Sequence, residues 1–140
     1  MEKNIILILL IFSFSIKVAL CFDCENYQGL CIAKSNIKYQ PIEEQPFMDA
    51  NFWAGARDAC ENIGGRLPTK EELEILYRYL QFKGVPYGTH DFWSSTEYRF
   101  KEGAPLYSAY YLYVNGIAPA AYIDNMNKRH GNWVGARCVK

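Results

Sequence analysis

Apolar and small residues recur at every third or fourth position early in the chain, which is the spacing of an amphipathic helix. Asp49 or Asn51 can cap the start of this helix, and the pair Gly64 and Gly65 ends it. The side chains that we expect to face the core are Phe52, Ala56, Ala59, Cys60 and Ile63. The sequence therefore predicts a first helix that turns a cysteine inward.

A second set of apolar residues with the same spacing runs from Lys70 to about Phe82 and ends before the helix-breaking residues 84–86. The glutamates of its first turn suit the positive end of a helix dipole. The side chains that this helix should bury are Leu73, Leu76, Tyr77 and Leu80. We therefore predict a second helix soon after the first.

A rigid corner is expected between the two helices. Either glycine of the pair can adopt the positive φ that ends a helix, and Pro68 fixes φ before the next one. Thr69 and Glu72 have the spacing of a capping box, in which each side chain accepts a hydrogen bond from a backbone amide. A buried guanidinium at Arg66 can bind backbone carbonyls or a carboxylate here, so we assign it a structural role in preference to a ligand role.

Beyond Pro86 the pattern changes to a two-residue alternation, which is typical of strands. In the longest segment both sets of alternate residues are apolar or aromatic, so we expect a sheet that is covered on both faces. Asn115 and Gly116 are a preferred pair for a tight hairpin turn, and Pro119 favours an edge position for part of the next strand. The predicted strands are His90–Thr96, Leu106–Val114, Ile117–Ile123 and Trp133–Val139, with a polar loop at Asp124–Gly131.

The first 21 residues have the layout of a secretory signal peptide. Lys3 precedes an apolar run, and the small residues Ala19 and Cys21 fit the rule for the cleavage site. The run is too short to cross a bilayer as a helix. We expect cleavage after Cys21 rather than acylation of Cys21, and only acylation would attach the protein to a membrane.

The rest of the chain is expected to form an N-terminal arm, residues 22–46, and one domain, residues 47–140, because half of the 140 residues are apolar. Within the arm, Ile37–Gln40 is a candidate short strand, and proline keeps Pro41–Pro46 extended. Fifteen basic residues balance fifteen acidic ones with no block of like charge, which argues against a nucleic-acid partner.

Removal of Cys21 with the signal peptide leaves four cysteines, and an even number in an exported chain indicates disulfides. Of three possible pairings we expect Cys24 with Cys31, in a small loop, and Cys60 with Cys138, between the first helix and the last strand. The second bond would stabilise the fold by roughly 4 to 5 kcal/mol in the chain-entropy model. A metal site is disfavoured because the four cysteines that remain after removal of Cys21 form no Cys-x-x-Cys, and no histidine stands at metal-ligand spacing from a cysteine.

Candidate binding residues lie in the aromatic second half of a chain that has eleven tyrosines. The segment from Trp93 to Thr96 offers an indole and three hydroxyls, which can stack on a sugar ring and hydrogen-bond to it. The alternative is a core tryptophan whose neighbours bond to nearby backbone, and we favour it for this segment. A tyrosine-rich hairpin and the polar loop after it supply further candidates. The candidate ligand-binding residues are Trp93, Ser94, Ser95, Thr96, Tyr111 and Arg129.

Catalytic signatures are weak. Ser94 and Ser95 do not lie in a Gly-x-Ser-x-Gly turn, and the carboxylates of Asp91 and Glu97 flank a predicted strand at an uncontrolled distance. We therefore expect no catalysis, no cofactor and no metal.

Four separated motifs resemble those of the Lcl C-terminal domain family, a group of bacterial secreted domains of largely unknown function. The motifs are Trp53, Ala56, Ala59 and Cys60; Gly64 to Thr69 with Glu72, Leu73 and Leu76; Phe92 to Thr96; and Ala136 to Val139. The resemblance covers Phe47 to Val139. It implies a C-type-lectin-like α+β fold, with two helices packed on a twisted antiparallel sheet and the first-helix cysteine bonded to the last-strand cysteine.

These features favour an exported, non-catalytic module that binds a glycan or a protein at the cell envelope. One alternative is a structural subunit of an envelope or pilus assembly, which would show an exposed apolar patch or an edge strand. The other is an enzyme of the formylglycine-generating or hydrolase kind, which would need a deep pocket around a group with a shifted pKa.

Overall fold

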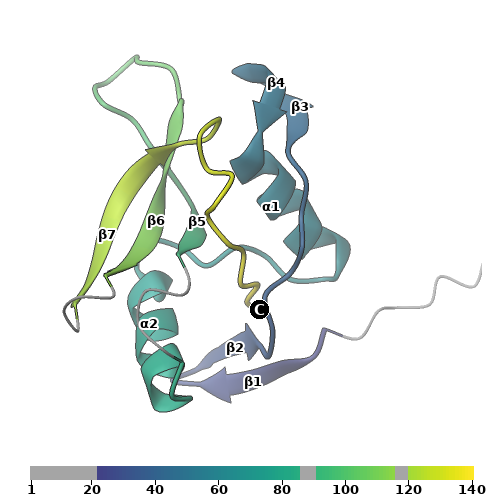
Figure 1. Cartoon of the computed structure of the whole chain (residues 1–140), viewed down its shortest axis with the longest axis vertical. Coiled ribbons are helices and arrows are strands. Elements are labelled where there is room, and N and C mark those ends of the chain that lie inside the picture. The colour runs from purple at the N-terminus through teal and green to yellow at the C-terminus, as the bar shows by residue number, and fades with distance from the viewer. Residues whose placement is uncertain (1–21, 86–90, 116–119) are drawn as a thin grey trace, which may run out of the picture.

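The structure is a computed structural model that describes residues 22–85, 91–115 and 120–140. It contains two helices and three antiparallel sheets, which confirms the predicted α+β class (Figure 1). The predicted signal peptide, His90 and the turn at Gly116 lie outside the described residues. The elements in chain order are β1 (Cys24–Tyr27), β2 (Leu30–Ala33), β3 (Ile42–Glu44), β4 (Phe47–Asn51), α1 (Phe52–Asn62), α2 (Glu72–Phe82), β5 (Phe92–Tyr98), β6 (Ser108–Asn115) and β7 (Ala120–Asn127).

The central sheet has the strand order β5-β6-β7 and is covered on both faces, as predicted. Alternate residues of a strand point to opposite faces. Trp93 and Tyr111, which are paired across β5 and β6, pack with α1, whereas Phe92 and Leu112 pack with α2. The sheet therefore separates two apolar clusters, and each helix closes one of them.

Helix α1 begins where Asn51 was expected to cap it, because the Asn51 side chain accepts a hydrogen bond from the amide of Ala54 at 2.9 Å. The helix ends before Gly64, whose φ is +84°. The predicted stripe was too narrow, since Trp53, Ala54 and Gly55 are also buried while Phe52, Ala59 and Ile63 are only half-buried. The indole of Trp53 faces the sheet, where it donates to the carbonyl of Ser94 at 2.7 Å. The chain at residues 40–41 instead covers the helix at Gly55. It lies so close that a Cβ at Gly55 would be 1.9 Å from the carbonyl oxygen of Gln40.

Helix α2 begins at Glu72, two residues later than predicted. The hydroxyl of Thr69 accepts a hydrogen bond from the amide of Glu72 at 3.2 Å, which is half of the predicted capping box. The Glu72 carboxylate pairs with Arg66 at 3.0 Å and so joins the two sides of the corner. The Arg66 side chain is exposed and not buried as expected, because it extends along the surface to reach Glu72. In the middle of the helix Tyr79 is buried, whereas Tyr77, the predicted core residue, is half-buried.

The corner is packed by the start of the described chain and by its end. A Cβ at Gly65 would lie 2.8 Å from Cε2 of Phe22, so only glycine fits here without a shift. Arg66 exchanges two backbone hydrogen bonds with Val139, at 2.9 and 2.8 Å. Pro68 is buried, and its carbonyl accepts a hydrogen bond from Ser95 at 2.7 Å. These contacts fix the corner against β5 and the C-terminal residues.

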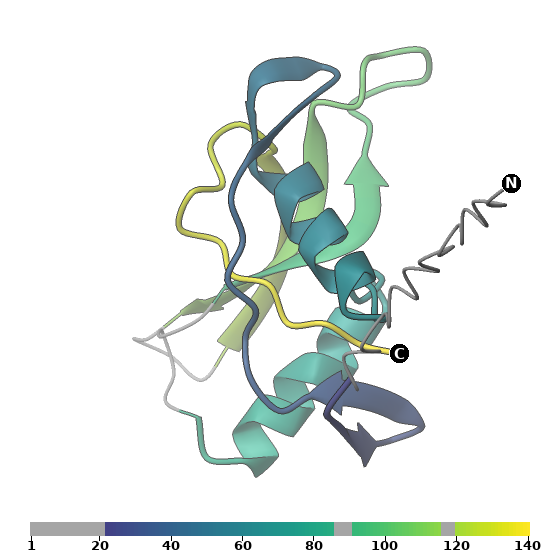
Figure 2. The same ribbon diagram turned by 90° about the vertical axis from the view of Figure 1, so that its right-hand side faces the viewer.

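The predicted N-terminal arm packs on the rest of the domain. Strands β1 and β2 form a hairpin that contains the expected Cys24–Cys31 disulfide, and Leu30 and Ile32 of β2 pack against α2 (Figure 2). Residues 37–40 are not a strand, contrary to the prediction, because a single backbone hydrogen bond, from Ile37 to Ala136 at 3.0 Å, does not make a ladder. Strands β3 and β4, a second hairpin, were not predicted, because the prolines that bound residues 41–46 conceal the short pairing.

The C-terminal residues 131–140 run between the sheet, α1 and the N-terminal hairpin (Figure 1). The predicted closing strand at 133–139 is replaced by isolated bridges, in which Gly135 pairs with Phe92 and Val139 pairs with both Ile32 and Arg66. The expected disulfide between Cys60 and Cys138 is present and ties this segment to α1. The segment has no ladder because each partner belongs to a different element.

Strand β7 continues to Asn127, so the predicted polar loop from Asp124 is four residues shorter than expected. The polar residues pair in register with β6, for example Asn125 with Tyr110 and Asn127 with Ser108. β7 lies at the edge of its sheet, and polar residues are tolerated where a strand meets solvent. Neither of the described helices is long and apolar enough to span a membrane.

Candidate functional site

The segment from Trp93 to Thr96 has structural contacts throughout. Trp93 is fully buried, and its indole nitrogen donates a hydrogen bond to the hydroxyl of Tyr39 at 3.1 Å. Ser94 is also buried, and its hydroxyl donates to the carbonyl of Tyr110 at 2.8 Å. Neither side chain presents area to a ligand. The interpretation of this pair as core, which the sequence favoured, agrees with the structure.

Thr96 and Ser95 join β5 to the start of α2. The hydroxyl of Thr96 accepts a hydrogen bond from the amide of Lys70 at 2.9 Å and so satisfies a backbone donor just before α2. The backbone of Ser94 binds α1, because its carbonyl accepts a hydrogen bond from the indole nitrogen of Trp53 at 2.7 Å. The hydroxyl-rich segment therefore connects both helices to the sheet.

Tyr111 lies beneath an exposed aromatic surface. The odd-numbered residues of β6 share the face that α1 covers, and α1 does not reach as far as Tyr113, which is 38% exposed. Tyr111 is only 6% exposed, and it contacts Trp93, Tyr113 and Trp133 with ring centroids 6.3, 6.4 and 5.8 Å apart. Trp133 is half exposed. We call Tyr113 and Trp133, with Tyr111 beneath them, the aromatic platform.

Trp133 was missed as a candidate because the sequence placed it within a strand. It lies at the third position of a turn, Gly131 to Val134, which is closed by a hydrogen bond from the amide of Val134 to the carbonyl of Gly131 at 3.1 Å. The sequence did contain a signal for a turn here, because Gly131 is followed by Asn132 and a second glycine, Gly135, comes soon after. The turn directs the indole outward, beside Tyr111.

The inner side of this turn is held by Tyr39 and Trp93. The Tyr39 hydroxyl donates to the carbonyl of Val134 and lies 3.3 Å from that of Gly131. Burial raises the pKa of Tyr39, so this hydroxyl remains a donor at neutral pH. A Cβ at Gly131 would lie 1.9 Å from Cζ2 of Trp93, so the backbone of the turn rests directly on the indole.

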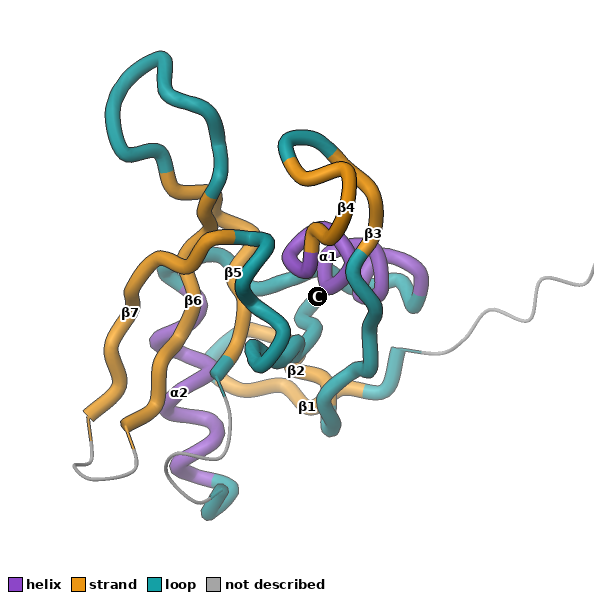
Figure 3. Tube along the Cα trace, turned by 45° about the horizontal axis from the view of Figure 1, so that its top comes forward, coloured by secondary structure: helices purple, strands orange, loops and turns teal. Residues whose placement is uncertain are grey.

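Arg129 makes its contacts at the other end of β6. Its guanidinium pairs with Asp49 of β4, and the rings of Phe47 and Tyr107 meet there at 5.7 Å. The loop of residues 99–107 and the β3–β4 hairpin project from this end (Figure 3). Of the six candidate residues, the structure brings Tyr111 and Trp93 together but gives Arg129 a separate environment.

Lys128 is a buried cation that the sequence did not single out. Its ammonium pairs with Glu97 at 2.7 Å and lies 4.1 Å from the centre of the Trp53 ring. Its backbone bonds both Phe52 and Tyr107, at 2.9 Å each. Lys128 therefore joins the ends of α1, β5 and β7, and this role is structural.

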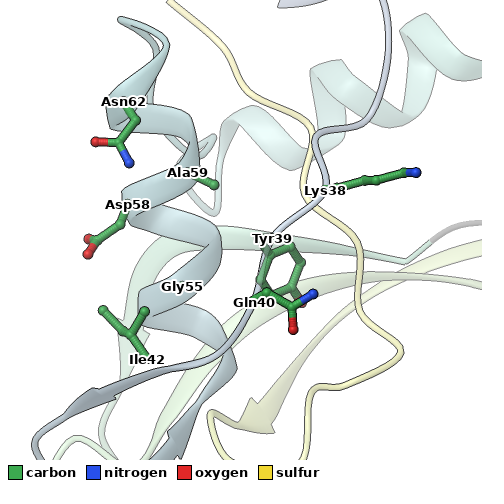
Figure 4. Close-up of a pocket in the computed structure, with 8 residues that line it drawn as sticks. All are labelled: Lys38, Tyr39, Gln40, Ile42, Gly55, Asp58, Ala59 and Asn62. Atoms are coloured by element: carbon green, nitrogen blue, oxygen red, sulfur yellow. The ribbon is translucent and has the colours of Figure 1, made fainter.

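A groove of about 420 Å³ lies between residues 38–42 and α1 (Figure 4). Its polar side chains do not converge, because Lys38 points away from Asp58 and Asn62 of the helix (Figure 4). The carboxylate of Asp58 is already paired with Arg57 at 2.7 Å. This groove lacks the inward-pointing polar groups that fix a ligand in a typical pocket.

The described residues contain no group of three or more histidine, cysteine, aspartate or glutamate side chains that could hold a metal ion. Four of the five cysteines are in disulfides. Comparisons with family models, curated protein sequences and solved structures found no match to this chain.

Proposed function

We propose that the protein is an exported, non-catalytic binding module with a C-type-lectin-like fold, which recognises a glycan or a protein of the cell envelope through the aromatic platform. Two disulfides in a small domain support export, because such bonds persist in oxidising compartments. Two helices against an antiparallel sheet, with a disulfide from α1 to the C-terminal residues, support the choice of fold.

The observation that carries the proposal is the exposure of Trp133. The other two tryptophans are buried, and each donates its indole N–H to an internal acceptor. Trp133 instead leaves half of its surface in solvent, next to the partly exposed ring of Tyr113. Tryptophan and tyrosine supply large contact areas at a low cost in side-chain entropy, and they dominate the energetics of many interfaces. Such rings can stack on the apolar face of a sugar or on the side chains of a protein.

Binding to an array of glycans and envelope proteins tests the proposal. We expect Trp133→Ala and Tyr113→Ala each to weaken binding by about tenfold or more, which corresponds to a loss of about 1.4 kcal/mol. Phe82→Ala is the matched control, because Phe82 is an exposed aromatic residue on α2. Equal binding by the native protein and by both platform variants would refute this surface. Trp93 and Tyr111 are too buried for an informative test by alanine substitution.

A structural subunit of an envelope assembly is the second candidate, and the position of β7 favours it. In the described part of the chain β7 pairs on one side, with β6, and it carries the partly exposed Ile123. An edge of this kind can accept a strand from another subunit. Sedimentation of the purified protein over a range of concentrations tests this role. Self-association that Ile123→Lys abolishes would support it, and a monomer at all concentrations would count against homotypic assembly.

A further inference from the structure

We propose that Tyr39 is a positioning residue for the aromatic platform, because its hydroxyl holds the turn Gly131–Val134 and thereby fixes the orientation of Trp133. The effect on ligand binding rests on the proposed function. The effect on the order of Trp133 needs no ligand and can be measured separately.

The first reason is the position of the Tyr39 hydroxyl. It accepts a hydrogen bond from the indole of Trp93 and faces the carbonyl oxygens of Gly131 and Val134, which are the first and last residues of the turn. The two residues between them are Asn132 and Trp133. One hydroxyl therefore holds both ends of the turn from inside the protein, while the tip faces solvent.

The second reason is that phenylalanine would fill the same space. A buried hydroxyl costs free energy unless it is hydrogen-bonded, so packing alone does not explain a tyrosine here. Tyr39 belongs to a segment without regular secondary structure that crosses from the N-terminal hairpin to β3. Its hydroxyl connects this segment to the turn, 92 and 95 residues further along the chain.

The third reason is that the turn is also held from below. The backbone of Gly131 rests on the indole of Trp93, and the Trp133 ring meets the Tyr111 ring edge to face, at 82° between the ring planes. Tyr111 in turn contacts Trp93. The exposed indole is therefore supported through its backbone and through its ring. A binding residue that is ordered before it meets a ligand loses less entropy on binding.

The test compares Tyr39→Phe with Tyr79→Phe. Both changes remove one hydroxyl with a hydrogen bond to a distant part of the chain, because the Tyr79 hydroxyl donates to Glu25 at 3.0 Å. Of these two tyrosines, Tyr39 contacts the turn, whereas the hydroxyl of Tyr79 bonds the N-terminal hairpin. The Tyr79→Phe variant therefore controls for a general loss of stability.

The readout is the ¹⁵N order parameter of each tryptophan indole in the protein. We expect the value for Trp133 to fall from about 0.85, typical of rigid groups, toward about 0.6 in Tyr39→Phe and to stay unchanged in Tyr79→Phe. Gly131→Ala, which forces the turn away from Trp93, should also change it. An unchanged Trp133 in Tyr39→Phe would overturn the inference, as would an equal fall in both tyrosine variants.

Binding to the ligand found on the array is the second readout. We expect Tyr39→Phe to weaken it by about two- to tenfold, the effect of losing the hydrogen bond that fixes the turn, and Tyr79→Phe to leave it unchanged. Loss of order at Trp133 in a protein that binds nothing on the array would uphold the positioning role and refute the proposed function. Loss of order with unchanged affinity would refute the link between the two.

Discussion

Removal of the Cys60–Cys138 disulfide should cost far more stability than removal of Cys24–Cys31. The bonded residues are 78 apart in the first case and 7 apart in the second. The chain-entropy model assigns these loops about 4.5 and about 2.4 kcal/mol at 25 °C, a difference of about 2 kcal/mol. A small domain is stable by only about 5 to 15 kcal/mol, so the first loss is a large fraction of the total.

Packing adds to this difference in the same direction. Cys60 and Cys138 are fully buried, whereas Cys24 and Cys31 are half-buried, so alanine leaves a larger gap in the first pair. The C-terminal residues also lack a strand ladder, and their backbone bonds go to scattered partners, such as that from Ala33 to Cys138 at 2.9 Å. Without the disulfide, the segment keeps only these bonds and the packing of its buried side chains.

Urea unfolding of the double variants Cys60→Ala/Cys138→Ala and Cys24→Ala/Cys31→Ala measures the two losses. We expect the long-range variant to unfold at the lower midpoint. We also expect the amide of Val139, which bonds Arg66 at 2.8 Å, to exchange with solvent faster in that variant. An equal or larger loss for the Cys24→Ala/Cys31→Ala variant would show that the long loop does not dominate the stability.

Two further predictions concern charged groups. Glu97→Ala should destabilise the protein more than Lys128→Met, by roughly 2 kcal/mol or more in a urea titration, because it leaves a buried ammonium unpaired whereas methionine removes the charge. Equal losses would contradict this. The hydrogen bonds from Arg57 hold the pKa of Glu44 below its ordinary value of 4.5, so its stabilising contribution is present above that pH and is lost as the pH falls through the lowered folded-state pKa. In Glu44→Gln the melting temperature should therefore fall less steeply than in the native protein as the pH is lowered from about 4.5. The same fall in both proteins would refute this assignment.

Local signals in the sequence predicted the helices well. The Asn51 cap, the glycine that follows α1 and the apolar stripes act within a few residues, so the sequence displays them directly. The alternation in β6 predicted a sheet covered on both faces. Each of these features depends on neighbours along the chain, as does the Cys24–Cys31 disulfide. The Cys60–Cys138 disulfide joins residues 78 apart and was expected from the even number of cysteines and from the family resemblance.

The features that were missed depend on distant partners. The burial of Gly55 follows from the chain at residues 40–41 crossing α1, and that of Trp53 from its contacts with Ser94 and Lys128, and the sequence near the helix indicates none of these contacts. The hydroxyl of Thr96 bonds the backbone just before α2, 26 residues away in the chain. Because the sequence does not show this partner, the hydroxyl was considered free to bind a ligand. Trp133 was assigned to a strand because the residue that stabilises its turn, Tyr39, lies far earlier in the chain and is not part of the local pattern. The aromatic platform could not be predicted without these contacts.

The most direct test of the proposed binding site is a titration of the ¹⁵N-labelled protein with the ligand found on the array. The signals of the three tryptophan indoles are followed by NMR. The signals of Trp53 and Trp93 serve as internal controls, because both indoles are buried and hydrogen-bonded. We predict that the Trp133 signal shifts with saturation while the other two stay nearly constant. A saturating shift at other positions, with the Trp133 signal unchanged, would contradict the assignment of the binding site to the aromatic platform.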